Sequence, residues 1–297
     1  MSASAPIDVI PAANGCGEGV LWDGRRQALW WTDIPGRRLH RYDWSTRSQR
    51  SFETPERVGS FGLVAGSDQF ITAFESGIAL YDPASTAGEQ RVSWLARPQA
   101  GIRGIRFNDG RVDRRGRFWC GTMVEEAGIT ERGNLYSIDG SQQLQCHVRG
   151  VSISNGLCMS RDGTQLYFAD SAARTIHVYE LIEPEGLLST PRLFAQTPEG
   201  ALPDGAAIDA EGHLWSAQWG AACIARYTPD GRLERTVPVP ASQPTCVCFG
   251  GPDLDLLFVT SARDGLDAAK LAHEPHAGHV FVYHTGVRGL PEEEYRL

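Results

Sequence analysis

The segment Asp209–Ala217, DAEGHLWSA, joins a turn containing Asp and Gly to a strand that opens on Leu214 and Trp215. A turn followed by two apolar residues, one usually aromatic, returns five more times along the chain. These segments are WDGRRQALWW at 22–31, AGSDQFITA at 65–73, DRRGRFWCG at 113–121, SRDGTQLYFAD at 160–170 and GGPDLDLLFVT at 250–260. Because Asp and Gly favour turns and aromatic residues favour strands, the repeated unit predicts short strands joined by tight turns.

The aromatic position of this unit recurs at nearly constant intervals. It falls at Trp30, Phe70, Trp119, Tyr167, Trp215 and Phe258, with spacings of 40, 49, 48, 48 and 43 residues. Periods of about 40 to 50 residues built from short strands are typical of β-propeller blades, which bury their faces against neighbouring blades. We predict an all-β fold, a six-bladed β-propeller that forms a single domain over residues 1–297. The alternative is an all-β sandwich in which common turn residues recur by coincidence.

Composition and charge narrow the classes of function. The chain has 297 residues and a net charge of −8, and its only lysine is Lys270, so we expect no nucleic-acid partner. Residues 1–15 lack the basic and apolar regions of a signal peptide, and no apolar run approaches the roughly 20 residues of a membrane helix. The seven cysteines include no CxxC pair. We expect a cytoplasmic protein without a membrane partner, either a monomer or a weak homo-oligomer.

A polar residue occupies a similar register in four of the six repeats. Glu18 and Asn155 precede the aromatic position of their repeat by 12 residues, and Asn108 and Asp204 precede theirs by 11. The innermost strands of a propeller line its channel, so equivalent positions in different blades converge. The register therefore predicts two carboxylates and two amides at one mouth of the channel. Taken singly, Asn-Gly and Asp-Gly pairs are also ordinary turn formers.

Such a cluster calls for a cation. Two neighbouring carboxylates repel each other, and each raises the pKa of the other. Carboxylate and amide oxygens are hard ligands that suit Ca²⁺, Mg²⁺ or Mn²⁺ and can also hold Zn²⁺ or Fe²⁺. Three protein oxygens leave coordination positions open for water and substrate. We expect one divalent metal ion at the centre of the propeller, and the ligand types do not select which.

Other chemistries have weaker support in the sequence. The chain contains no GxSxG, GxGxxG or P-loop motif, so it does not favour a serine hydrolase or a nucleotide cofactor. His273, His276 and His279 have a spacing that could suit a metal site. They follow the last repeat in a segment interrupted by proline, and we expect them to be solvated loop residues.

Three stretches around the polar residues resemble the family of gluconolactonase, senescence marker protein (regucalcin) and luciferin-regenerating enzyme. They are RFNDGRVDRRGRFWCGTM at 106–123, SNGLCMSRDGTQLYFADS at 154–171 and LPDGAAIDAEGHLWSAQW at 202–219. The resemblance covers nearly the entire chain. It implies a six-bladed propeller, a sugar lactonase of bacterial type, with one catalytic metal held by a Glu, an Asn and an Asp. Those positions match Glu18, Asn155 and Asp204.

The resemblance also implies a substrate site. Arg106 and Asn108 match residues that hold the substrate, and an acidic residue after the GTM segment takes part in some members of the family. That residue is Glu125 or Glu126 here, and we take Glu126 as the prediction. The metal varies within the family among calcium, zinc, manganese, magnesium and iron(II).

These features lead to a hypothesis for the reaction. We expect a carboxylic ester hydrolase that opens an aldonolactone, a sugar lactone, to the aldonic acid in sugar catabolism. The metal would polarise the ring carbonyl and activate water, with Asp204 as both ligand and base. Arg106 and Asn108 would orient the sugar hydroxyls, and Arg106 would help to hold the oxyanion. The alternatives are a propeller hydrolase acting on aryl esters or phosphotriesters, and a non-catalytic calcium-binding propeller.

Overall fold

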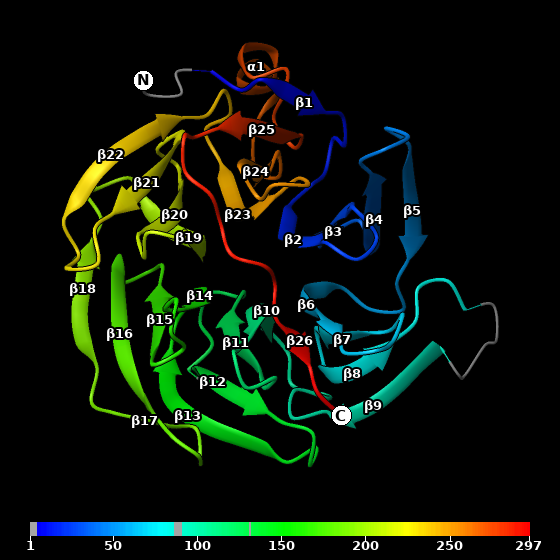
Figure 1. The fold of residues 1–297 in the computed structure, drawn as a ribbon, viewed down its shortest axis with the longest axis vertical. Helices are drawn as coiled ribbons and strands as arrows, with labels where there is room; N and C mark the ends of the chain where they lie inside the picture. Colours follow the sequence, from blue (N-terminus) through cyan, green and yellow to red (C-terminus); the bar gives the residue numbers. More distant parts are fainter. Residues whose placement is uncertain (1–4, 86–90, 131) are drawn as a thin grey trace.

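The computed structural model describes residues 5–85, 91–130 and 132–297, which form a ring of six small β-sheets around a central axis (Figure 1). The expected six-bladed β-propeller is confirmed. Within this part of the chain the only α-helix is α1 (Ala268–His273), so the fold is nearly all-β. No helix in these residues has the length and apolar composition needed to cross a bilayer.

Each sheet is one blade, and its strands follow one another outward from the axis. Blade one contains β2 (Gly17–Asp23), β3 (Ala28–Asp33), β4 (Arg38–Asp43) and β5 (Gln49–Glu53). Blade two contains β6 (Val58–Val64), β7 (Phe70–Phe74), β8 (Gly77–Tyr81) and β9 (Val92–Ala96). Blade three contains β10 (Ile105–Val112), β11 (Phe118–Val124), β12 (Gly133–Ile138) and β13 (Leu144–Val151). Blade four contains β14 (Ser154–Met159), β15 (Gln165–Asp170), β16 (Thr175–Ile182), β17 (Leu187–Leu188) and β18 (Arg192–Gln196). Blade five contains β19 (Leu202–Ile208), β20 (Leu214–Trp219), β21 (Cys223–Tyr227) and β22 (Leu233–Pro238). Blade six contains β23 (Pro244–Gly250), β24 (Leu256–Ser261), β25 (Val280–His284) and β1 (Asp8–Ile10).

The aromatic positions predicted from the repeat all lie on the second strand of a blade, and all are buried. They are Trp30 in β3, Phe70 in β7, Trp119 in β11, Tyr167 in β15, Trp215 in β20 and Phe258 in β24. Six hydrophobic clusters in the described residues each combine side chains of two neighbouring blades. One of them packs Trp215 of blade five with Phe249 and Phe281 of blade six. The period of the sequence thus reflects the packing of blade on blade.

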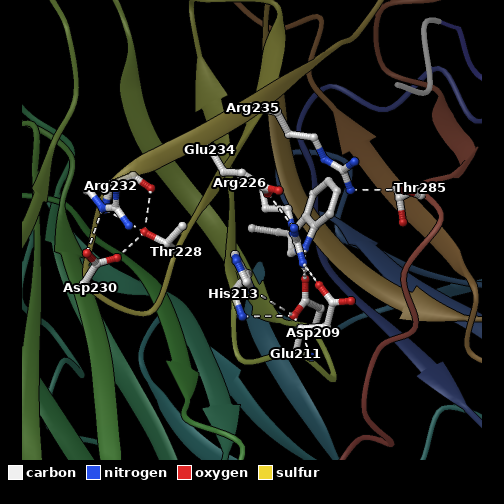
Figure 2. A network of polar contacts seen from close by, with 11 residues as sticks. Asp209, Glu211, His213, Arg226, Thr228, Asp230, Arg232, Glu234, Arg235 and Thr285 are labelled. Atoms are coloured by element: carbon white, nitrogen blue, oxygen red, sulfur yellow. Dashed lines mark hydrogen bonds and ion pairs between the residues drawn. The ribbon is translucent and has the colours of Figure 1, made fainter. Parts of the chain in front are cut away.

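The acidic residue of the repeat closes the turn before the second strand. In blade five, Oδ1 of Asp209 accepts hydrogen bonds from the backbone N–H groups of Glu211 and His213, both at 2.9 Å. Its Oδ2 accepts one from Nε1 of Trp215 at 2.8 Å and two from the guanidinium of Arg226 (Figure 2). The corresponding residues of blade three are Asp113, Arg115, Arg117 and Trp119. This turn explains why Asp, Gly and an aromatic residue recur together.

Both ends of the chain complete the ring. Strand β1 pairs antiparallel with β25, so an N-terminal strand closes blade six. From β25 a strap, residues 285–297, runs back across the centre of the ring to β26 (Glu294–Tyr295), which pairs in parallel with β6 (Figure 1). Glu292 of the strap forms an ion pair with Arg111, in the C-terminal half of β10. The polar residues expected at the channel mouth lie nearer the N-terminal ends of the innermost strands.

Candidate metal and active site

The four polar residues of the repeat lie where the innermost strands depart from regular pairing. The register of each strand with its outer neighbour shifts at Glu18 in β2, at Asn108 in β10, at Asn155 in β14 and at Asp204 in β19. A β-bulge bends a strand and re-aims the side chains at that point. The common irregularity directs four polar side chains from four blades toward the axis.

The structure brings these four side chains together. Nδ2 of Asn108 donates a hydrogen bond to Oδ1 of Asn155 at 2.9 Å, and the carboxyl groups of Glu18 and Asp204 lie close enough for each to affect the pKa of the other. Ser171 links the two pairs, because its Oγ accepts from Asn155 at 2.9 Å and donates to the backbone carbonyl of the residue before Asp204 at 2.7 Å. Glu18, Asn108 and Asp204 line one cavity of about 400 Å³.

A third carboxylate, Asp109, lies beside this cluster, and sequence reasoning missed it. Asp109 is buried, and Oδ1 and Oδ2 accept hydrogen bonds from the backbone N–H groups of Gly110 and Leu157. Burial raises the pKa of Asp109 to about 6. Burial, followed by the charge of Asp109, raises the pKa of Glu18 to about 8, and burial and the charge of Glu18 raise the pKa of Asp204. The one signal in the sequence that could have indicated Asp109 was its place in the Asn-Asp-Gly bulge.

The axial carboxylates differ from the other buried carboxylates in their partners. Asp113 and Asp209 each form an ion pair with a buried arginine. Within the described residues, Glu18, Asp109 and Asp204 form no ion pair. Three buried carboxylates without a paired cation are electrostatically unfavourable, and a divalent ion held by hard oxygen ligands removes the repulsion. The donor atoms present therefore fit a divalent cation.

A chain of charged groups forms one wall of the cavity. Nε of Arg106 donates to Oε1 of Glu125 at 2.6 Å, and Nη1 of Arg106 donates to Oδ1 of Asn108 at 2.7 Å. Arg57 donates to both carboxylate oxygens of Glu125 at 2.9 Å. Arg57, Arg106 and Glu125 all line the cavity. Glu126, predicted to bind substrate, instead lines a neighbouring surface pocket.

The rest of the cavity lining is largely apolar. Its side chains come from the loops and strand ends around the mouth: Ile34, Pro35, Met123, Ile153, Leu202 and Trp219. Trp219, at the end of β20, is the one aromatic residue among the lining side chains in the described part of the chain. The cavity therefore offers both polar and apolar contacts to a bound molecule.

A second group of potential metal ligands has a structural explanation. Asp209, Glu211 and His213 offer ligand atoms within 4.8 Å of one another. The carboxylate of Asp209, however, already accepts hydrogen bonds from the turn and from Arg226, and Arg226 also pairs with Glu211 (Figure 2). The positive charge that a cation would supply is already present in Arg226. This cluster stabilises blade five.

The three histidines whose spacing could suit a metal site lie outside the cavity. His273 ends α1, and its Nδ1 lies 2.7 Å from the backbone carbonyl of Ala269. His276 is exposed. The expectation of solvated loop residues is wrong for His279, because it is half-buried and its Nδ1 accepts from the backbone N–H groups of Ala12 and Ala13 at 3.2 and 3.0 Å. His279 thus ties the N-terminal segment to blade six.

The fold and the site define a class of protein, the six-bladed propellers with a carboxylate-lined cavity on the axis. Residues 16–263 match the family model described as the SMP-30/Gluconolactonase/LRE-like region, and the chain belongs to this family. The resemblance of the sequence is thereby confirmed.

Individual relatives align over nearly their full length. A 6-deoxy-6-sulfogluconolactonase of Pseudomonas putida is 38% identical over 96% of this chain and 96% of its own length. An L-arabinolactonase of Azospirillum brasilense is 36% identical over 93% of this chain and 91% of its own length. The crystal structure of a calcium-binding protein, regucalcin, from Agrobacterium tumefaciens has a TM-score of 0.92 and 30% sequence identity. The alignment covers 100% of this chain and 99% of that one.

Proposed function

We propose that this chain is a carboxylic ester hydrolase that opens a sugar lactone to the aldonic acid. The observation that carries the proposal is the set of buried carboxylates without a paired cation at one end of the axial channel. Glu18, Asn155 and Asp204 would hold one divalent cation there, with Asp109 adding negative charge behind them. Relatives named as lactonases, at 34 to 38% identity, support a lactone as the substrate.

Each chemical requirement of lactone hydrolysis has a candidate group in the cavity. A divalent cation supplies Lewis-acid polarisation of an ester carbonyl and lowers the pKa of water. Asp204 takes the proton of the attacking water, because its carboxylate lies in the cavity, where a water molecule beside the cation would be within reach. The proton then passes to the ring oxygen that leaves.

Arg106 is suited to hold the substrate. Its Nε and Nη1 are committed to Glu125, to Asn108 and to a backbone carbonyl. Within the described residues its Nη2 makes no hydrogen bond, so this nitrogen can donate to an oxygen of the lactone. The committed nitrogens fix the guanidinium, so that little side-chain entropy is lost on binding.

Asn108 is better suited to positioning than to holding the substrate. Its Oδ1 accepts from Arg106, and its Nδ2 donates to Asn155 and to the backbone carbonyl of Ser154, both at 2.9 Å. Both ends of the amide are therefore engaged. We assign Asn108 the role of holding Arg106 in register with Asn155. Glu125, rather than Glu126, is the acidic residue of the substrate site, because only Glu125 lines the cavity.

A panel of aldonolactones, assayed for acid release, tests the proposal. The metal-loaded protein is expected to hydrolyse at least one of them, and chelation followed by metal addition should remove and restore the activity. Asp204→Ala should lower kcat by a factor of about 100 or more, the usual contribution of a positioned base. Asp253→Ala, which changes an exposed aspartate of blade six, is the control. Activity of Asp204→Ala within a few-fold of wild type would rule the scheme out.

The apolar residues of the cavity lining give one reason to add aryl esters to the panel. A single aromatic residue, Trp219, lies among the described lining residues, and an aryl ester would gain from more aromatic contact. We therefore expect faster hydrolysis of the sugar lactones. Faster hydrolysis of an aryl ester would favour the alternative, and metal binding without any hydrolysis would favour a calcium-binding propeller.

A further inference from the structure

We propose that Glu125 makes the cavity select uncharged lactones over anionic ones, because it neutralises the two guanidinium groups that line the cavity. This inference rests on the proposed lactonase function. Arginines in a substrate cavity would ordinarily attract a sulfonate, phosphate or carboxylate on the substrate. Here the protein provides their anionic partner itself.

The geometry around Glu125 is that of a bridge between two arginines. Both oxygens of Glu125 accept from Arg57 at 2.9 Å, which makes a two-pronged ion pair, and Oε1 also accepts from Nε of Arg106 at 2.6 Å. Glu75 occupies the remaining side of Arg57, accepting from its Nε at 2.6 Å. An incoming anion would have to displace one of these carboxylates to pair with Arg57.

The charge balance of the cavity leads to the same conclusion. Its described lining includes four carboxylates, Glu18, Glu125, Asp204 and Asp264, and two guanidinium groups, Arg57 and Arg106. A divalent cation brings the sum to zero. A substrate anion entering this space would lose its hydration without finding an unpaired positive charge, which is costly. An uncharged sugar requires only hydrogen bonds, which Arg106 can still donate through Nη2.

The same arrangement affects the product. Hydrolysis converts an uncharged lactone into an aldonate, so a carboxylate appears inside the cavity. If Arg57 and Arg106 were free, they would form ion pairs with that carboxylate and delay its release. With Glu125 in place, the cavity favours departure of the product it generates.

Two substrates and three proteins test the proposal. The substrates are an aldonolactone that the wild-type protein hydrolyses and its analogue with a sulfonate on the terminal carbon. The proteins are the wild type, Glu125→Gln, and Glu56→Gln as a matched control. Glu56 lies on the same side of the ring and pairs with Arg97, and neither residue lines the cavity. Both variants remove one negative charge and keep the length of the side chain.

For the wild type we expect kcat/KM to be at least about tenfold higher for the uncharged lactone. In Glu125→Gln the ratio of anionic to uncharged kcat/KM should rise by about tenfold, the order of one charge–charge interaction in a partly hydrated site. In Glu56→Gln the ratio should stay within about twofold of wild type. Because the readout is a ratio, a general loss of activity in Glu125→Gln does not obscure it.

Two results would overturn the inference. One is equal or better hydrolysis of the sulfonated analogue by the wild type, and the other is an unchanged ratio in Glu125→Gln. If Glu125→Gln does not fold, Glu75→Gln serves instead, since it loosens Arg57 from its other side and should move the ratio in the same direction by a smaller factor. If the wild type hydrolyses no aldonolactone of the panel, the proposed function itself is contradicted, whereas hydrolysis without a charge preference contradicts only the role of Glu125.

Discussion

Two kinds of buried carboxylate serve opposite purposes in this propeller. Asp209 is fully buried and bonded to Trp215 and Arg226, so its charge is compensated and it stabilises a turn. Glu18 and Asp204 are buried almost as deeply, yet face each other and form no ion pair in the described residues. The same chemical group stabilises the fold in the first case and is available to a ligand in the second.

Replacing Asp209 by alanine should therefore destabilise the protein strongly. The change leaves the guanidinium of Arg226 buried with fewer partners and removes two backbone hydrogen bonds of the turn. We expect the free energy of unfolding to fall by about 3 kcal/mol, as measured by urea denaturation. Asp230→Ala removes an exposed partner of Arg232 on the same blade and should leave the midpoint of denaturation nearly unchanged (Figure 2). Similar losses in the two variants would contradict this account.

Site residues could be predicted from the sequence where the repeat fixes their register. The structure gathers four residues that precede the aromatic position by 11 or 12 residues: Glu18, Asn108, Asn155 and Asp204. Glu125 could not be separated from Glu126, because these residues follow β11 where no repeated pattern sets the direction of a side chain. Asp109 and Arg57 escaped notice for the same reason: each is offset from the repeated position.

At the scale of the strand, the bulges of the innermost strands are as important as the residues they present. In blade two the corresponding residue is Gly59, where β6 also shifts register. A Cβ at Gly59 would lie 2.4 Å from the backbone oxygen of Asn108 and 2.7 Å from that of Phe107. Strands β6 and β10 therefore approach so closely that only glycine fits, and this contact holds the bulge that carries Asn108.

Gly59→Ala should disturb the site as well as the fold. The added methyl group must push the backbone of β10 aside, which should cost about 1–3 kcal/mol of stability and misalign Arg106 relative to Asn155. We expect kcat/KM to fall by about tenfold or more and the melting temperature to drop by several degrees. Gly24→Ala is the control, because the nearest atom to its Cβ lies 3.9 Å away. If both variants retain wild-type activity, the contact between β6 and β10 does not position the site.

The strand pattern was predictable in its period but not in its exceptions. The aromatic positions identify the second strand of every blade because a buried ring is needed at each contact between blades. The pairing of β1 with β25 and the additional strand β17 (Leu187–Leu188) at the edge of blade four leave no comparable mark. Both depend on contacts between segments distant in sequence or on an irregular outer edge.

For the whole molecule, the axial carboxylates should make stability depend on metal and pH together. In the cation-free protein the folded state raises the pKa of Glu18 to about 8 and that of Asp109 to about 6, and it also raises the pKa of Asp204. Between the unfolded and folded pKa values the folded state binds more protons than the unfolded state. Their contribution to stability is therefore present at acidic pH and lost as the pH rises toward 8.

Thermal unfolding with and without a divalent cation measures this effect. The increase in melting temperature on adding the cation should be larger at pH 8 than at pH 5.5. At pH 5.5 protons bound to the carboxyl groups compete with the cation, whereas at pH 8 these protons have largely dissociated. A Glu18→Gln, Asp204→Asn double variant should lose most of this difference. An equal response to the cation at both pH values, or an unaltered response in the double variant, would show that the axial carboxylates are not the binding groups.

The pairing of β1 with β25 determines when blade six can be completed during synthesis of the protein. Strand β25, at Val280–His284, lies far along the sequence from β1, so it is synthesised long after its partner. Until β25 is available, β1 has no partner strand, and its exposed edge could pair with a wrong strand. Blade six is therefore completed only after β25 has been synthesised, and a chain that stops before Val280 leaves the ring unsealed.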